Sequence, residues 1–414
     1  MDSSSSPRFP DSSSRVREPA PPSRFVARIA LLFSAPLFIN GFALPFFPVW
    51  LASLSFDAAQ ISVILAVPMF VRVFSAPVAG MIADALGERT RLLLWSAGLS
   101  LLTALGLFVS HAFWAVLAIY TLQGVVYSPY VPIVEAVALT GVRRWGFDYA
   151  RMRLWGSIAF ICATMIGGAL ISRFGAMMVL PAMTVGFVGM VAVTFLAPRV
   201  GAPRRPSTLT TLADPPPKAL RAPDIQMLLM GVGLVNGSHG MLFAFSALYW
   251  TSIGFSGTEV GLLWSAGVAA EIAMFVAAKV ILVRVSLWAM IFSGAGLAIL
   301  RWLVFPLDLG FWGTFALQCS HAFTYAIMHT GLQTMLVRRV AERQETAAQG
   351  LYFFYTGIFT ALCTFVSGIF YGWFGVHGFL SMAVAAFIGF ALLIAAWTLQ
   401  PQSSGSSGMS SEPS

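Results

Sequence analysis

The sequence predicts an all-α integral membrane protein whose twelve transmembrane helices form two six-helix halves. Three observations predict this fold class. Apolar residues make up 58% of the 414 residues and charged residues only 10%, whereas an ordinary soluble domain has about 25% charged residues. Twelve apolar runs are long enough to cross a bilayer, which takes about 20 residues. Of the 24 Lys and Arg residues, 21 fall on one predicted side of the membrane.

The composition also excludes several classes of protein. With a mean hydropathy of +0.82, the chain has too few polar residues to cover a soluble enzyme or a nucleic-acid-binding domain. The net charge of +8 is therefore attributed to basic residues that set the orientation of the chain in a membrane. The three cysteines lie inside apolar runs and have neither disulfide nor metal-ligand spacing. No Gly-x-x-x-x-Gly-Lys-Ser/Thr loop occurs, so we expect no ATP drive and no cofactor.

The apolar runs divide into two sets of six, separated by a polar break. The first set comprises 26–51, 59–83, 91–110, 112–140, 152–172 and 176–197. The second set comprises 225–253, 258–283, 286–306, 311–337, 347–372 and 377–399. Several runs exceed 25 residues, which predicts tilted or kinked helices. Prolines interrupt the first, second and fourth runs, whereas the second set holds only Pro306.

Composition sets the expected domain boundaries. Two six-helix halves are expected at 25–198 and 224–400, joined by a cytoplasmic linker at 199–223 that is rich in proline and basic residues. The segments 1–24 and 401–414 have no apolar face, so we expect both to be disordered cytoplasmic tails.

The placement of Lys and Arg predicts that both termini are cytoplasmic. With this orientation, Arg173 is the one basic residue on an outer loop, and Arg72 and Arg301 lie within spans. A bias of this size determines topology, and it also explains the basic pI without a nucleic-acid ligand.

The loop after the second apolar run carries a motif. It reads Gly80-Met-Ile-Ala-Asp84-Ala-Leu-Gly87-Glu-Arg89-Thr-Arg91, which resembles the loop signature of the major facilitator superfamily. Gly80 and Gly87 permit close approach and a tight turn. Asp84 can accept from a helix N-terminus or pair with an Arg, so we expect Gly80, Asp84, Gly87 and Arg89 to form a gating loop. A merely basic turn is the alternative.

Five ionisable side chains lie deep inside predicted spans, where charge is costly and usually functional: Arg72, Glu135, Glu271, Arg301 and His321. Counting from hairpin turns places three pairs at equal depth: Glu135 with Arg153, Arg301 with His321, and Glu271 with Arg301. We therefore expect a polar cavity near the midplane. Each pair is also compatible with a structural lock between helices, and Arg72 has no partner that the sequence identifies.

Further polar and aromatic residues fit such a cavity. His329 lies about 80° around the helix from His321 and can share its face. Either Arg153 or Arg301 can bind a carboxylate through two hydrogen bonds. Aromatic residues including Tyr127, Trp264 and Tyr325 can form the walls, although most aromatic side chains in such a chain only pack.

Four stretches resemble the phenylpropionate permease family of major facilitators. They are Ser128 to Glu135, Asp148 to Ser157, Gly237 to Trp250, and Gly261 to Glu271; Arg-Leu-Trp-Gly-Ser at 153–157 is the most specific. The resemblance covers residues 25 to 399. It implies a proton-coupled symporter of the bacterial inner membrane that takes up aromatic carboxylates such as 3-phenylpropionate.

A more distant resemblance is to the lactose permeases. Their sugar-contacting acidic and Arg residues have the spacing of Glu135 and Arg153, but their proton-carrying carboxylate falls at the position of Thr324 here. Another group must then carry the proton. The candidates are Glu271, because burial and a neighbouring Arg oppose each other in setting the proton affinity of a carboxylate, and His321 or His329.

The sequence thus predicts alternating-access, proton-coupled uptake of an aromatic carboxylate by a monomer that performs no chemistry on its substrate. Sugar or nucleoside symport and drug/proton antiport on the same fold stay open as alternatives. A third is a nutrient sensor that retains the fold.

Overall fold

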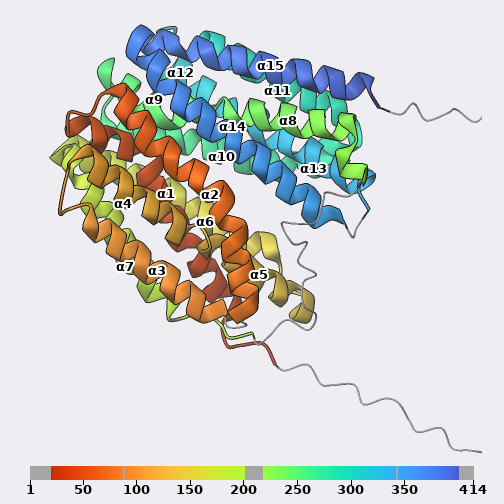
Figure 1. Cartoon of the computed structure of the whole chain (residues 1–414), viewed down its shortest axis with the longest axis horizontal. Coiled ribbons are helices and arrows are strands. Elements are labelled where there is room, and N and C mark those ends of the chain that lie inside the picture. Colours follow the sequence, from red (N-terminus) through yellow and green to blue (C-terminus); the bar gives the residue numbers. More distant parts are fainter. Residues whose placement is uncertain (1–19, 87–88, 201–217, 342–343, 401–414) are drawn as a thin grey trace, which may run out of the picture.

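The computed structural model describes residues 20–86, 89–200, 218–341 and 344–400, and these ranges form helices and short connections without a strand (Figure 1). The first half contains α1 (Phe25–Ser53), α2 (Ala58–Leu86), α3 (Arg89–Gly106), α4 (Phe113–Tyr127), α5 (Tyr130–Trp145), α6 (Tyr149–Phe174) and α7 (Val179–Thr194). A short 3-10 helix, η1 (Ala176–Met178), precedes α7.

The second half begins after η2 (Lys218–Arg221), a short 3-10 helix in the connection between the halves. Its helices are α8 (Pro223–Gly237), α9 (Gly240–Ser252), α10 (Gly257–Arg284), α11 (Leu287–Val304), α12 (Gly310–Cys319), η3 (Ala322–Ile327), α13 (Met328–Arg339), α14 (Glu345–Phe374) and α15 (Phe379–Thr398). The final pair is joined by η5 (Gly375–Gly378). Residues 20–24 of the expected N-terminal tail and residues 199–200 and 218–223 of the expected linker are described. The rest of these two segments and the expected C-terminal tail lie outside the described residues.

Twelve spans follow from these helices, as predicted. Within the described ranges, nine stretches are long and apolar enough to cross a membrane. One of them, Ala347–Thr398, is 52 residues long and contains both α14 and α15. The two remaining spans are α3 and the α12–η3–α13 segment, whose polar side chains lower their hydropathy.

Three spans are divided into shorter helices. The fourth span breaks between α4 and α5 at Pro129, which cannot donate a backbone hydrogen bond. The seventh breaks between α8 and α9 without a proline, where Gly237 and Gly240 press against the backbone of α14. The tenth contains the π-helix η3. The three prolines of α1, in contrast, lie within one continuous helix.

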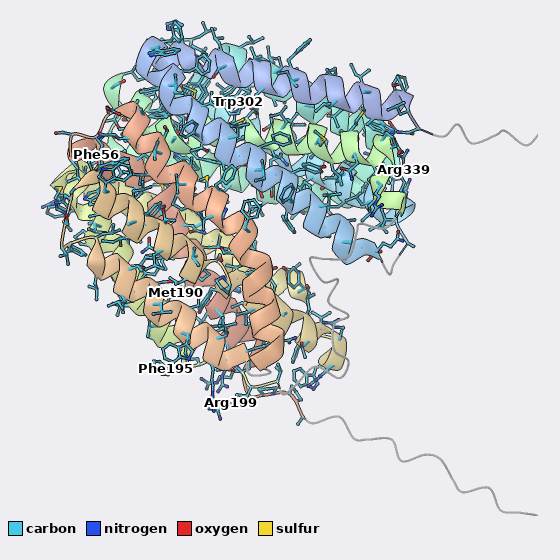
Figure 2. All side chains as sticks on the ribbon, in the orientation of Figure 1. Phe56, Met190, Phe195, Arg199, Trp302 and Arg339 are labelled. Carbon is cyan, nitrogen blue, oxygen red and sulfur yellow. The ribbon has the colours of Figure 1, made fainter. Side chains whose placement is uncertain are left out.

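The two halves meet at one end and diverge towards the other (Figure 1). We call the diverging end the basic end, because Arg89, Arg143, Arg144, Arg338 and Arg339 lie at the helix ends there. In Figure 2, Phe56 lies where the halves meet, whereas Arg199 and Arg339, from different halves, are far apart.

Small residues allow the halves to approach closely at the meeting end. Gly168 of α6 lies against the backbone of Gly257 at the start of α10, and a Cβ atom at Gly257 would come within 2.7 Å of the carbonyl oxygen of Gly168. One turn away, the hydroxyls of Thr164 and Ser265 are 2.7 Å apart and buried. On the other side of the interface, Gly368 of α14 faces Ser62 of α2. Helix pairs α6–α10 and α2–α14 therefore close this end.

Gly168→Ala should destabilise the closed end, because its Cβ atom would meet backbone, which yields less readily than a side chain. We expect a cost of about 1–3 kcal/mol, seen as a lower thermal unfolding midpoint. Spin labels at Phe174 and Ile253 should also move apart. Gly189→Ala is the matched control, since a Cβ atom there has no neighbour within 4 Å. Equal behaviour of the two variants would contradict the closure.

Candidate functional site

The guanidinium of Arg301 is the centre of a buried polar cluster in the second half. Arg301 lies on α11 and is 1% exposed. Its Nη1 atom donates to His321 Nδ1 at 3.1 Å and to Thr324 Oγ1 at 3.4 Å, and its Nη2 atom donates to Gln318 Oε1. The predicted proximity of Arg301 and His321 is thus confirmed. The Nε atom of Arg301 is buried without a partner.

Glu271 contacts His321 and not Arg301, so the equal depth expected for Glu271 and Arg301 does not correspond to a direct pair. Glu271 Oε2 lies 3.7 Å from His321 Nε2, and the two side chains keep 24% and 18% of their surfaces accessible. Counting residues had placed Glu271 and Arg301 at similar depth. His321 lies between the two side chains, and depth alone does not fix which neighbour a side chain faces.

The contacts of His321 define its tautomer. Arg301 can only donate, so His321 Nδ1 must accept, and the ring proton of the neutral imidazole is on Nε2. Nε2–H therefore points towards the Glu271 carboxylate. A charged imidazolium donates from both nitrogens, so His321 cannot be protonated while it accepts from Arg301.

His239 completes the cluster, although no role was predicted for it from the sequence. Its Nδ1 atom lies 3.3 Å and 3.2 Å from the carbonyl oxygens of Val235 and Asn236, so it carries the proton. Its Nε2 atom therefore accepts from the hydroxyl of Thr324 at 3.1 Å. The break between α8 and α9 beside Gly237 and Gly240 positions this ring, a signal that was readable in the sequence.

The π-helix η3 aligns the aromatic residues of the tenth span. The rings of His321 and Tyr325 stack 5.6 Å apart, and those of Tyr325 and His329 stack 5.7 Å apart. The wider turn of a π-helix brings residues four apart nearly above one another. His329 Nδ1 lies 3.1 Å from the hydroxyl of Tyr352 on α14. His329 thus shares the face of His321, as predicted, through Tyr325.

Arg153 on α6 extends the polar region into the first half. Its guanidinium lies 5.5 Å from the centre of the Phe33 ring and is within electrostatic reach of both Glu135 and Glu271. Glu135 accepts from Tyr149 at 3.5 Å. No direct ion pair joins Glu135 to Arg153 among the described residues, so the expected pair is a looser association.

The aromatic residues that were expected to form the walls of the cavity lie in different environments. Tyr127 donates to the carbonyl oxygen of Pro36 at 2.8 Å and lies 3.3 Å from Asn40 Oδ1 on α1. Trp264 is 6% exposed, packs on Phe243, and has an unpaired indole Nε1.

Arg72, for which the sequence identified no partner, lies within electrostatic reach of Tyr120 and Tyr127 on α4. Its side chain is exposed in the described structure.

The predicted gating loop is described only in part. Arg89 Nη1 lies 3.3 Å from Thr140 Oγ1 and 3.5 Å from the carbonyl oxygen of Ala136, so Arg89 joins the second loop to α5. Gly80 lies in α2, Gly87 lies outside the described residues, and so does the side chain of Asp84. In the part of the chain that the structure describes, no three His, Cys, Asp or Glu side chains gather as a metal site requires.

Comparison with known proteins identifies the family. The model of the MFS_1 like family matches residues 31–382. The chain belongs to this family. Its members have the major facilitator fold, so the chain is a multi-pass membrane protein and a secondary transporter rather than an enzyme.

Individual relatives agree with this assignment. The chain is 28% identical over 371 residues to the Probable 3-phenylpropionic acid transporter of Escherichia coli (strain K12), covering 86% of this chain and 94% of that protein. It is 26% identical over 321 residues to the maltose permease of Geobacillus stearothermophilus, covering 75% and 79%. The crystal structure of the nucleoside transporter NupG matches with a TM-score of 0.78 and 15% identity, covering 91% of this chain and 99% of that chain.

Thr324→Val should destabilise this major facilitator, because it removes the hydroxyl that joins Arg301 to His239. A buried group left without its partner costs about 1–3 kcal/mol, which should lower the thermal unfolding midpoint in detergent. Thr330→Val is the matched control, since the Thr330 hydroxyl donates only to the carbonyl oxygen of Ala326 in its own span. A Thr324→Val protein as stable as the control would argue against the network.

Proposed function

We propose that this transporter couples the uptake of an aromatic carboxylate, such as 3-phenylpropionate, to the inward movement of protons across the bacterial inner membrane. The observation that carries the proposal is the chain of contacts from Arg301 through His321 to Glu271, with Arg153 of the other half in electrostatic reach. This arrangement provides a carboxylate that can carry a proton and a guanidinium that can bind a substrate anion. The relationship to the Escherichia coli protein favours the substrate class.

Arg153 is the better candidate for the substrate carboxylate. The Nη atoms of Arg301 are already bonded and its side chain is almost fully buried. Arg153 is half-buried, and no hydrogen bond of its guanidinium is found among the described residues. The Phe33 ring beside it is itself buried, so the apolar walls for the ring of an aromatic acid are expected from other side chains. Tyr325, also within reach of Arg153, and Trp264 can complete the walls.

Glu271 is the better candidate for the coupling proton. His321 must stay neutral while its Nδ1 atom accepts from Arg301. The carboxylate of Glu271 is partly accessible and can accept a proton without breaking the Arg301–His321 bond. His329 stays an alternative, because its ring lies at the basic end of the same aromatic stack.

Alternating access follows from the two halves. We infer that the basic end is cytoplasmic, from the distribution of Lys and Arg, so the closed end faces outwards. The halves would then rock to expose the central residues to each side in turn.

Substrate class is tested by uptake of labelled 3-phenylpropionate into proteoliposomes with acid outside, after subtraction of protein-free liposomes. We expect saturable uptake that collapses with a protonophore. Arg153→Gln should raise the half-saturation concentration about tenfold to a hundredfold, as expected for losing a charge-assisted bond. Arg173→Gln, at the other end of α6, is the control.

Competition separates the alternative substrates. A sugar or nucleoside symporter is the second candidate, because Glu135 and Tyr149 beside Arg153 are suited to hydroxyl groups. Inhibition by unlabelled aromatic acids but not by sugars or nucleosides would support the proposal. The reverse pattern would assign the site to the second candidate.

Glu271→Gln tests the coupling group. Glutamine retains the hydrogen-bonding shape but cannot carry a proton, so accumulation driven by a pH gradient should be abolished. Exchange of internal for external substrate needs no net proton movement and should continue. Glu259→Gln, on the same helix, retains the capping box at Ser256 and should accumulate substrate normally. Accumulation by Glu271→Gln at the wild-type level would exclude Glu271 as the carrier of the proton.

A further inference from the structure

A pocket of about 810 Å³ lies at the basic end, between the start of α1 and the first turns of α6. Arg24, Leu31, Phe147, Arg151 and Trp155 are among the residues that line it. None of these belongs to the central polar cluster, and the proposed transport mechanism uses none of them.

The pocket opens on the outer surface of the bundle and not towards the other half. On α6, Thr164 and Gly168 face α10, whereas Gly156 and Gly167 face α1. Arg151 and Trp155 lie on a third face, which continues through the exposed side chains of Ile158 and Ile166. An exposed apolar stripe along a transmembrane helix faces acyl chains, so the pocket lies where this stripe reaches the membrane surface.

The pocket carries two positive charges that no described residue neutralises. Among the described residues, the guanidinium groups of Arg24 and Arg151 make no hydrogen bond or ion pair. None of the described residues lining the pocket is acidic, and the nearby carboxylate of Asp148 accepts from the backbone N–H of Arg151.

The backbone at Arg24 is unusual for a residue with a side chain. It has φ 54° and ψ 33°, in the left-handed region, directly before α1 begins. Non-glycine residues seldom adopt this conformation, and its cost is tolerated where position matters. The conformation orients the Pro21–Arg24 segment along the pocket.

We propose that this pocket binds one anionic phospholipid, with the phosphate between Arg24 and Arg151 and an acyl chain along Leu31 and Trp155. Arginine is suited to phosphate because its planar group donates two parallel hydrogen bonds. Tryptophan is typical of the interface between headgroups and acyl chains. Anionic lipids of the cytoplasmic leaflet attract such basic groups at this depth.

The test is a titration of the full-length protein in detergent with equal amounts of phosphatidylglycerol and phosphatidylcholine, read by native mass spectrometry. We expect one preferentially bound phosphatidylglycerol. The double variant Arg24→Gln, Arg151→Gln should lose this preference by about tenfold or more, since each basic residue contributes on the order of 1 kcal/mol. Lysine at both positions should restore most of it, because lysine retains the charge.

The matched control is Arg143→Gln, Arg199→Gln, which removes the same charge from the basic end outside the pocket. An equal loss of preference in the control would overturn the site in favour of a diffuse surface charge. An unchanged preference in the Arg24, Arg151 variant would leave the pocket to another occupant, such as the chain's own N-terminal residues. Release of the lipid by equimolar inorganic phosphate would show that the acyl chain contributes nothing and would also contradict the proposal.

Discussion

The burial of the Arg301 guanidinium is the constraint on which the second half of the structure depends. An unpaired cation inside a bilayer is costly, so its donors need acceptors from neighbouring helices. Gln318, His321 and Thr324 provide them from a single span. Gln318 precedes the π-helix η3, and Thr324 lies within it. Thr324, inside η3, contacts both Arg301 and His239, whereas His321, directly before η3, contacts Arg301 and Glu271.

A second constraint acts at the meeting end, where the halves touch through backbone. Gly168 against Gly257, and Gly368 against Ser62, bring helices closer than larger side chains would permit. Backbone contacts of this kind depend little on attraction between particular side chains. The two surfaces can therefore separate and come together again. The polar cluster lies beneath this closure, where partly accessible Glu271 and His321 border the fully buried Arg301. Tight backbone packing thus forms the closure, whereas hydrogen bonds to the two Nη atoms hold the buried charge of Arg301.

The sequence predicted the spans and the depths of the charged residues, because hydropathy and rise per residue depend only on position along the chain. Arg301 and His321 are in contact as counting required. Which neighbours a side chain faces depends on the rotation of its helix about the helix axis. This rotation could not be predicted from the sequence. Glu271 therefore meets His321 instead of Arg301, and Arg153 of the other half lies within electrostatic reach of Glu271. The contact between His239 and Thr324 was not predicted, because the two residues lie 85 positions apart in the chain. The side chains of the gating loop, apart from that of Arg89, lie outside the described residues.

The position of Thr324 resolves how such a cluster can function without a carboxylate there. A carboxylate at this position would pair directly with Arg301, whereas the Thr324 hydroxyl accepts from Arg301 and donates to His239. The two Nη atoms of Arg301 are thereby bonded to neutral groups of their own half. Glu271 contacts neutral His321 and has Arg153 of the opposite half within electrostatic reach. Because the proton affinity of a carboxylate depends on the cation beside it, a rotation that moves Arg153 relative to Glu271 would change that affinity. In the proposed mechanism, a substrate anion bound to Arg153 would alter the same interaction, which would link substrate, proton and conformation.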